Sequence, residues 1–311
     1  MCGRRQRLGV LAAASAAALA VAPAAAAHGD EVPASEVWTR WTFEPIPVVA
    51  AAVAVAFFLQ GWLRLRGRGR LDHAGFDRLG LFLAGVVVVL LGIVSPLDPI
   101  AEEYLQSAHM LQHVLIADIG VALIVVAMRG PLTVFFLPRP VLIALARSRL
   151  ARGAARTITR PALTVGLWTA ALVVWHVPAL YERALAVTWV HDLQHVSFIA
   201  VGTLVWIQLV DPTRHGRLSL GERIGLAAIV FWVGQILAYV IVFDPSPLFS
   251  AYTEQDERLL GLSALTDQKI AGALMMVEQL FTVGVCLLVL IGQARRQRAA
   301  AGARPDEIPA A

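Results

Sequence analysis

Long apolar stretches alternate with short polar connections along this chain, and that pattern defines the elements we expect. After the N-terminal leader, seven apolar stretches each approach the roughly 20 residues that cross a bilayer as a helix. They cover residues 46–63, 79–96, 107–128, 161–176, 189–210, 224–243 and 270–292. Because every connection is too short for a separate soluble domain, we expect an all-α fold, a polytopic membrane helical bundle of seven transmembrane helices.

The N-terminus has the pattern of a secretory signal peptide. A basic "MCGRRQR" precedes the apolar "LGVLAAASAAALAVA" and then small residues spaced like a cleavage site, ending at Ala27. The pattern predicts a signal peptide over 1–27, an extracytoplasmic segment over 28–45, the seven-span membrane domain over 46–292 and a disordered cytoplasmic tail over 293–311. An uncleaved first anchor is the alternative for the leader. Cleavage after Ala27 would make His28 the first residue, with an amine and an imidazole that together can chelate a metal ion.

Composition agrees with a membrane protein. The chain is 58% hydrophobic and 15% charged, with a mean hydropathy of +0.69, whereas soluble domains carry about 25% charged residues. Its two cysteines, Cys2 and Cys286, cannot build a disulfide framework or a thiolate metal site. A site for a soft metal must therefore use histidine and methionine.

The positions of the basic residues predict the orientation. Of the 26 Lys and Arg residues, 19 fall in connections 64–78, 129–160 and 211–223 and after residue 292. The positive-inside rule places these regions in the cytoplasm, with the mature N-terminus outside and the C-terminus inside. The basic, amphipathic segment 131–160 is expected to lie along the inner membrane face. Because topology explains the basic excess, we expect membrane lipids and no nucleic acid as partners, in the bacterial plasma membrane.

Two nearly identical hexapeptides carry the candidate chemistry. "HMLQHV" spans residues 109–114 and "HDLQHV" spans 191–196, and each opens a span that starts outside. On a helix, residues four apart share a face about 6 Å apart along the axis, so both imidazole pairs can point at one object. His176 ends the outward fourth span at the same level. A single such histidine is more often an interfacial or packing residue, but the matching pairs predict a shared metal site that faces outside.

The last span adds sulfur and acid to this set. Its sequence "LTDQKIAGALMMVEQLF" offers Met275 and Met276, and thioether with imidazole is the ligand set that suits Cu(I), although methionine also fills cores. We predict no catalytic residue. The predicted metal ligands are His109, His113, His176, His191, His195, Met275 and Met276, with Gln112, Asp192, Gln194, Asp267 and Glu278 as their hydrogen-bond partners. Asp118 should face away from His109 on a regular helix and lie outside the metal site.

A series of motifs resembles a known family. The stretches "SPLDPIAEEYLQSAHMLQHVLI", "RGPLTVFFLPRP", "WHVPALYERAL", "VHDLQHVSF" and "TDQKIAGALMM" follow one another in this order. Together they resemble the CtaG family of polytopic cytochrome c oxidase assembly factors, which is found with caa-type oxidases, and the likeness covers residues 45–292. By position, the matching residues are His109, His113, His176, His191, His195 and the stretch 267–276. The tandem methionines depart from the Met and bulky residue that we expect, which leaves open which of them matters.

The resemblance implies a membrane protein that is needed to make active cytochrome c oxidase, with oxidase subunits as partners and copper as the metal it handles. Our leading hypothesis is an assembly factor or metallochaperone, not an enzyme, that passes copper to a nascent oxidase subunit. The alternative is a haem-binding redox protein or haem-modifying enzyme, because membrane cytochromes hold b-type haem between histidines of facing helices. A metal transporter is a third hypothesis, and a homo-oligomer is compatible with all three.

Overall fold

The computed structural model describes residues 32–213, 216, 218–255 and 257–302, and every regular element in them is a helix. The expected signal peptide over 1–27 and His28 lie outside these residues. The long helices are α2 (Pro45–Arg66), α3 (Phe76–Val94), α10 (Pro161–Trp175), α12 (Thr188–Val210) and α13 (Leu220–Phe243). Two further long helices are each interrupted by a π-helical segment. The first consists of α5 (Gln106–His113), η3 (Val114–Ile119) and α6 (Gly120–Ala127), and the second of α14 (Ala264–Gln279), η6 (Leu280–Gly284) and α15 (Val285–Gly302). We call each of these long helices, interrupted or not, a rod. The short elements are η1 (Val37–Thr39), η2 (Leu71–His73), α4 (Leu97–Glu103), α7 (Leu132–Phe135), α8 (Arg139–Arg147), α9 (Arg149–Ile158), α11 (Pro178–Ala186), η4 (Ser250–Tyr252) and η5 (Leu259–Gly261).

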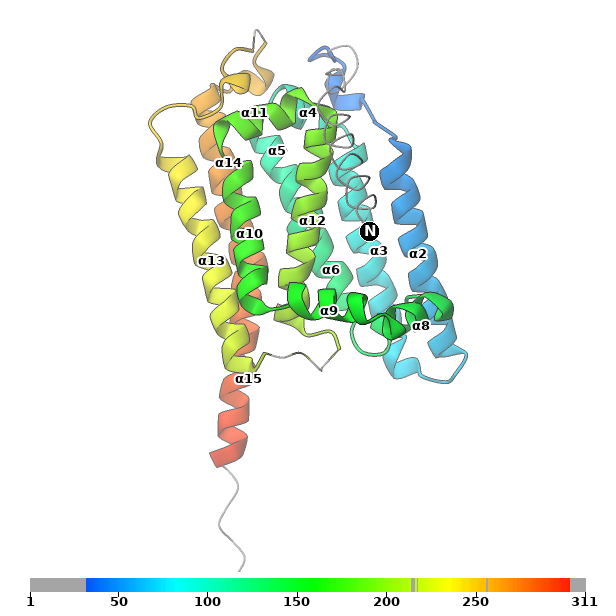
Figure 1. Ribbon diagram of the computed structural model, residues 1–311. Coiled ribbons are helices and arrows are strands. Elements are labelled where there is room, and N and C mark those ends of the chain that lie inside the picture. Colours follow the sequence, from blue (N-terminus) through cyan, green and yellow to red (C-terminus); the bar gives the residue numbers. More distant parts are fainter. Residues whose placement is uncertain (1–31, 214–215, 217, 256, 303–311) are drawn as a thin grey trace, which may run out of the picture.

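The rods run side by side and make a multi-pass membrane bundle (Figure 1). Six of them are long and apolar enough to cross a membrane. A seventh candidate is the pair of α9 and α10, which meet at an angle of 68°. Because α10 has 15 residues, it is about 22 Å long, shorter than the ~30 Å hydrocarbon core. The predicted all-α membrane bundle is thus confirmed with six to seven candidate spans.

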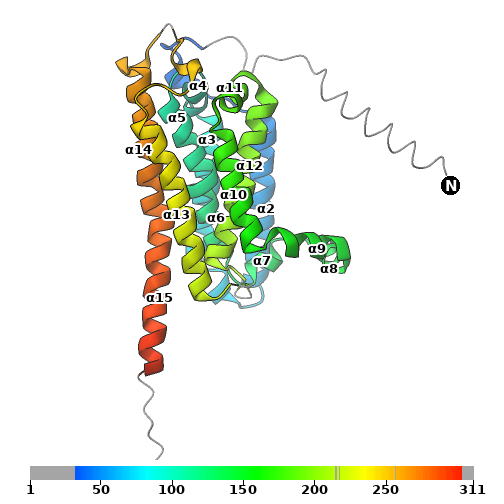
Figure 2. The same ribbon diagram turned by 60° about the vertical axis from the view of Figure 1, so that its left-hand side comes forward.

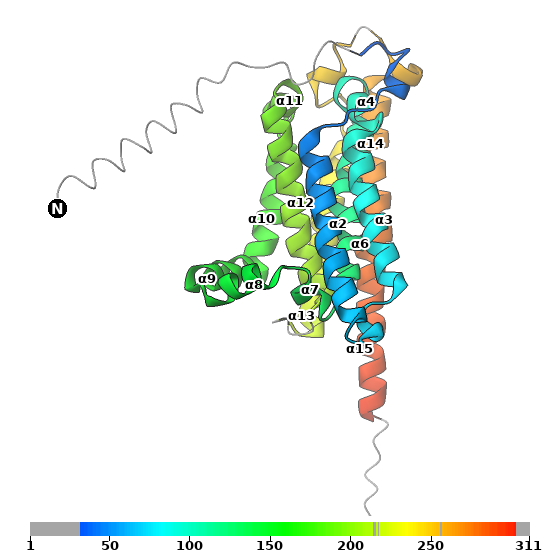
Figure 3. The ribbon, with the colours of Figure 1, turned by 90° about the vertical axis from the view of Figure 1, so that its right-hand side faces the viewer.

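The two ends of the bundle differ in character. We call the end formed by α4, α11 and the first turns of α5 and α12 the histidine end, and the end formed by α7, α8 and α9 the arginine end. At the arginine end, α8 and α9 lie across the rods (Figures 1 and 3). α15 projects from the same end (Figure 2) and continues to Gly302, beyond residue 292 where we expected the span to end.

Local sequence signals explain where several helices begin. Proline occupies the first turn of α2, α10 and α11, where its missing N–H removes no helical hydrogen bond. α13 starts with a capping box in which Ser219 and Glu222 bond each other's backbone N–H groups. The side chain of Ser263 accepts a hydrogen bond from the Thr266 backbone at the start of α14.

Glycine permits the closest approach between the rods that carry the two hexapeptides. A Cβ atom at Gly202 of α12 would lie 2.4 Å from the Ala117 carbonyl oxygen in η3. Small residues at such crossings let membrane helices pack backbone to backbone. The tight crossing fixes α12 against η3 directly below the histidines.

Candidate metal centre

Four histidines from α5 and α12 face one another at the histidine end. The ring centroids of His109 and His191 lie 5.4 Å apart, and those of His113 and His195 lie 5.2 Å apart. Within each helix the rings are separated by 4.4 Å on α5 and 4.1 Å on α12. All four side chains are buried. The i, i+4 spacing of the two hexapeptides therefore produces a compact block of imidazoles.

Three of these histidines are placed to share one ion. His109, His113 and His191 each offer a ring nitrogen, and the three nitrogens lie within 4.8 Å of one another. Since a metal–nitrogen bond is about 2.0–2.1 Å long, two nitrogen ligands of one ion can be at most about 4.2 Å apart. Small rotations of the rings would close this difference. His195 and His176 do not belong to this group of three.

The Nδ1 atom of His191 is hydrogen-bonded to a carboxylate. Its partner is Glu102 Oε1 of α4, and both side chains are 4% exposed. A carboxylate that accepts from Nδ1 fixes the tautomer of a neutral imidazole and leaves the lone pair on Nε2, as in the carboxylate–histidine–metal arrangement. His191 is thereby oriented as an Nε2 ligand.

His109 is oriented in the same way by a tyrosine hydroxyl. Its Nδ1 lies 3.1 Å from the Tyr252 hydroxyl, which donates its own proton to the Ala101 carbonyl at 2.8 Å. Tyr252 must therefore accept from His109 Nδ1–H, which leaves the lone pair on Nε2. Tyr181 completes the network by donating to Tyr252 at 3.3 Å. Burial raises the pKa of both phenols above their ordinary value, so both hydroxyls keep their protons.

His176 and His113 also carry ring nitrogens that lack a hydrogen-bond partner among the described residues. His176 Nδ1 donates to the Leu172 carbonyl at 2.7 Å, and its Nε2 has no hydrogen-bond partner in the described part of the chain. His113 has no such partner on either ring nitrogen among the described residues. Because an unpaired buried polar atom is unfavourable, these nitrogens indicate a ligand.

The predicted hydrogen-bond partners have different positions. Gln112 donates to Asp98 at 2.6 Å, and the buried Gln194 lies beside His109. Asp192 is on the exposed face of α12. Asp267 of α14 accepts from the backbone N–H groups of Gln106 and Ser107 at 2.6 and 3.2 Å. It therefore caps the start of α5 and fixes the helix that carries His109 and His113.

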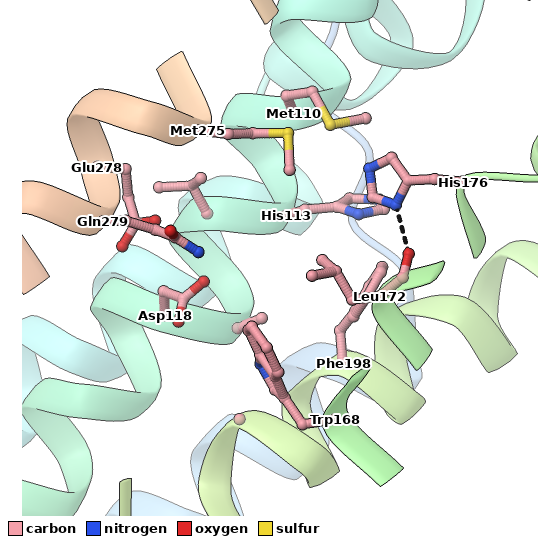
Figure 4. A pocket seen from close by; sticks show the side chains of 13 residues that line it. Met110, His113, Asp118, Trp168, Leu172, His176, Phe198, Met275, Glu278 and Gln279 are labelled. Carbon is pink, nitrogen blue, oxygen red and sulfur yellow. Dashed lines mark hydrogen bonds between the residues drawn. The ribbon is translucent and has the colours of Figure 1, made fainter. Parts of the chain in front are cut away.

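The two methionines of the last span have different surroundings. Met275 lines a small cavity with Met110, His113 and His176, and their side chains point toward one another (Figure 4). Met276 does not line this cavity and packs, partly buried, against the hydrophobic core to which Met275 belongs. Glu278 lines the same cavity as Met275, at its opposite side from the histidines (Figure 4).

Sequence reasoning missed Glu102, Tyr252 and Tyr181. Glu102 lies seven residues before His109 and is followed by a second glutamate, Glu103, and an acidic residue so close to an apolar span could have signalled a partner. Tyr252 lies 143 residues after His109 in the chain, and no sequence pattern connects the two. These residues determine which histidine nitrogens are available to a metal.

Comparison with known proteins agrees with the resemblance found in the motifs. The family described as cytochrome c oxidase caa3 assembly factor (Caa3_CtaG) matches residues 56–297, which include the four clustered histidines, His176 and both methionines. No curated protein and no solved structure matches the chain. The matched region covers most of the chain, so this protein belongs to the Caa3_CtaG family of cytochrome c oxidase assembly factors.

Proposed function

We propose that this protein binds copper at the histidine end and delivers it to a subunit of a caa3-type oxidase during assembly. Membership of the assembly-factor family implies interaction with oxidase subunits. The observation that carries the copper proposal is the group of His109, His113 and His191, whose ring nitrogens lie within 4.8 Å. Two of the three present Nε2 because Glu102 and Tyr252 accept from Nδ1.

The surrounding side chains favour Cu(I). Three neutral imidazoles bring no negative charge, and the thioethers of Met110 and Met275 lie at the adjacent cavity. Soft sulfur and imidazole ligands select Cu(I) over hard cations, which prefer oxygen. The arginine-rich opposite end supports an orientation with the copper centre on the extracytoplasmic side.

The packing of the rings argues against haem. An axial pair needs one histidine on each side of a flat macrocycle. Here each histidine of one helix has a second imidazole within 4.4 Å on the same helix and a third within 5.4 Å on the other. The four rings fill the space that a porphyrin would occupy.

Copper counting on the purified full-length protein tests the proposal. Metal-free protein in detergent is loaded anaerobically with Cu(I), passed over a competing chelator, and analysed by mass spectrometry for bound metal. We expect a single ion per wild-type chain and background copper in the His109→Ala/His191→Ala variant. The matched control is His73→Ala, because His73 pairs with Asp72 outside the histidine end. Unchanged copper in the double variant would overturn the copper centre.

A cell-based measurement tests delivery. A strain that depends on this protein for its caa3-type oxidase should lose oxidase activity and oxidase copper with the double variant and keep both with His73→Ala. Normal oxidase copper in a strain with the double variant would contradict delivery from this site, whether or not the purified protein binds copper.

A further inference from the structure

A buried cavity lies below the histidines, toward the middle of the bundle (Figure 4). Its volume is about 60 Å³, and its wall includes His113 of α5, His176 after α10, Asp118 of η3 and Glu278 of α14. One water molecule occupies about 30 Å³ in the liquid, so the cavity has room for an ion or for a few waters.

Two carboxylates from different helices meet at this cavity. Asp118 and Glu278 are close enough to interact electrostatically, and both belong to candidate membrane spans. The Trp206 indole is within hydrogen-bonding reach of Asp118, and the Thr282 hydroxyl donates to Glu278 at 2.5 Å. Among the described residues, neither carboxylate takes part in an ion pair. Two such acids in a low-dielectric interior require a cation or a proton between them.

The opposite wall of the cavity carries nitrogen atoms that lack partners. His113 is 8% exposed and is directed into the cavity, and neither of its ring nitrogens is hydrogen-bonded within the described part of the chain. His176 contributes its Nε2 in the same way. The cavity therefore joins imidazole nitrogens on one side to carboxylate oxygens on the other.

The π-helical segment η3 explains how Asp118 reaches this position. On an α-helix, Asp118 would be rotated by about 140° from His113, at 100° per residue. The hydrogen bonds of a π-helix link residues five apart, which places them nearly above one another. η3 contains Asp118, whereas Glu278 lies on the regular helix α14, three residues after Met275 and on the same face. Asp118, which was predicted to face away from His109, thus lines the same cavity as His113.

We propose that Asp118 and Glu278 bind a divalent metal ion in this cavity, as a second site beneath the copper centre. Two carboxylates match a charge of two, and the remaining coordination positions can be filled by water. Oxygen ligands suit Mn²⁺, Mg²⁺ or Ca²⁺ and disfavour Cu(I). The site takes a different class of ion from the three histidines and does not depend on copper being bound above it.

Manganese and copper can be measured together in the full-length protein. Mn²⁺ gives an electron paramagnetic resonance signal, and Cu(I) gives none. Metal-free protein is titrated with Mn²⁺, with and without prior Cu(I) loading, and the signal of free Mn²⁺ is followed. We expect one tightly bound Mn²⁺ per chain in both samples. No saturable Mn²⁺ binding in the wild type overturns the proposal.

Variants separate the second site from the copper centre. Asp118→Asn/Glu278→Gln should bind Mn²⁺ at least about tenfold more weakly and keep Cu(I). His109→Ala/His191→Ala should lose Cu(I) and keep Mn²⁺. The matched control is Asp192→Asn/Glu254→Gln, which removes the same charges from exposed positions. Equal loss of Mn²⁺ in the control, or loss only in the histidine variant, contradicts the proposal.

Wild-type protein provides a measurement that does not depend on a folded variant. A hydrophobic carbodiimide attaches covalently to carboxyl groups inside membranes, and peptide mass spectrometry locates the product. We expect labelling of Asp118 or Glu278 that Mn²⁺ suppresses severalfold, with no suppression at Glu254. Labelling of the pair that Mn²⁺ leaves unchanged would show that a shared proton, and not a metal ion, balances the two acids.

Discussion

The two hexapeptides differ at one position of six, yet the structure uses them differently. In "HMLQHV", Met110 and Val114 are 2% and 6% exposed, and the peptide is enclosed by other helices. In "HDLQHV", Asp192 is exposed and Val196 is 62% exposed. The single difference, Met110 against Asp192, therefore follows burial: α5 lies inside the bundle and α12 turns one face outward.

The histidines of the two peptides differ in the same sense. His109 and His191, the first of each pair, are both oriented through Nδ1, by Tyr252 and Glu102. The second histidines of the two pairs differ. His113 belongs to the group of three and lines the cavity, whereas His195 lines an apolar groove of about 780 Å³ beside α2. Histidines at the same position of the two hexapeptides thus have different surroundings, and single substitutions can show whether their effects on metal binding differ.

The largest difference is expected between His113→Ala and His195→Ala. Loss of His113 removes one of three ligands, so Cu(I) affinity should fall by at least about 100-fold, more than the loss of a ligand's hydrogen-bond partner. His195→Ala should remain close to the wild type. Competition with a Cu(I) chelator measures both. A larger loss in His195→Ala than in His113→Ala would show that the ion lies on the α12 side of the block.

Next in size is the effect of Glu102→Gln. Removing the carboxylate that accepts from His191 should weaken Cu(I) binding by about 10–100-fold, since such partners orient the ring and raise its basicity. Glu103→Gln is the control, because the Glu103 carboxylate accepts from Val32 N–H at 3.1 Å. Equal affinities for the two variants would mean that Glu102 does not orient a ligand.

Gly202→Ala tests the crossing that holds the two peptides together. The added methyl would lie 2.4 Å from the Ala117 carbonyl oxygen, and overpacking of this kind destabilises a protein by about 1–3 kcal/mol. Thermal unfolding in detergent should show a lower Tm. Gly166→Ala is the control, because no atom lies within 4 Å of its Cβ position. A Tm for Gly202→Ala equal to that of Gly166→Ala would show that the crossing relaxes without loss of stability.

The smallest effect is expected for Tyr252→Phe. It removes one neutral hydrogen bond from His109, worth about 0.5–1.5 kcal/mol, so Cu(I) affinity should fall about twofold to tenfold. Tyr239→Phe, on the exposed face of α13, should have no effect. If Tyr252→Phe weakened binding more than Glu102→Gln, the orientation of His109 would matter more than that of His191.

The bundle and the facing histidines could be predicted from the sequence, because they follow from the length of the apolar stretches and from the i, i+4 spacing of a helix. Hydropathy located the rods, and the i, i+4 spacing brought His109, His113, His191 and His195 into one block. The position of Asp118 did not follow, because a π-helical segment changes the rotation per residue and leaves no composition signal. The partner Tyr252 could not be predicted either, since it sits on a short connecting element whose approach depends on the packed bundle.

The cap on α5 has a consequence for biogenesis. Asp267, at the start of the last rod, bonds the first backbone N–H groups of the helix that carries His109 and His113, more than 150 residues earlier in the chain. Tyr252, which orients His109, precedes that rod by only a short connection. The centre therefore cannot reach its final geometry until the last rod has inserted. If the centre binds copper as proposed, a chain arrested before that point would hold the ion poorly, and copper binding would report that membrane insertion is complete.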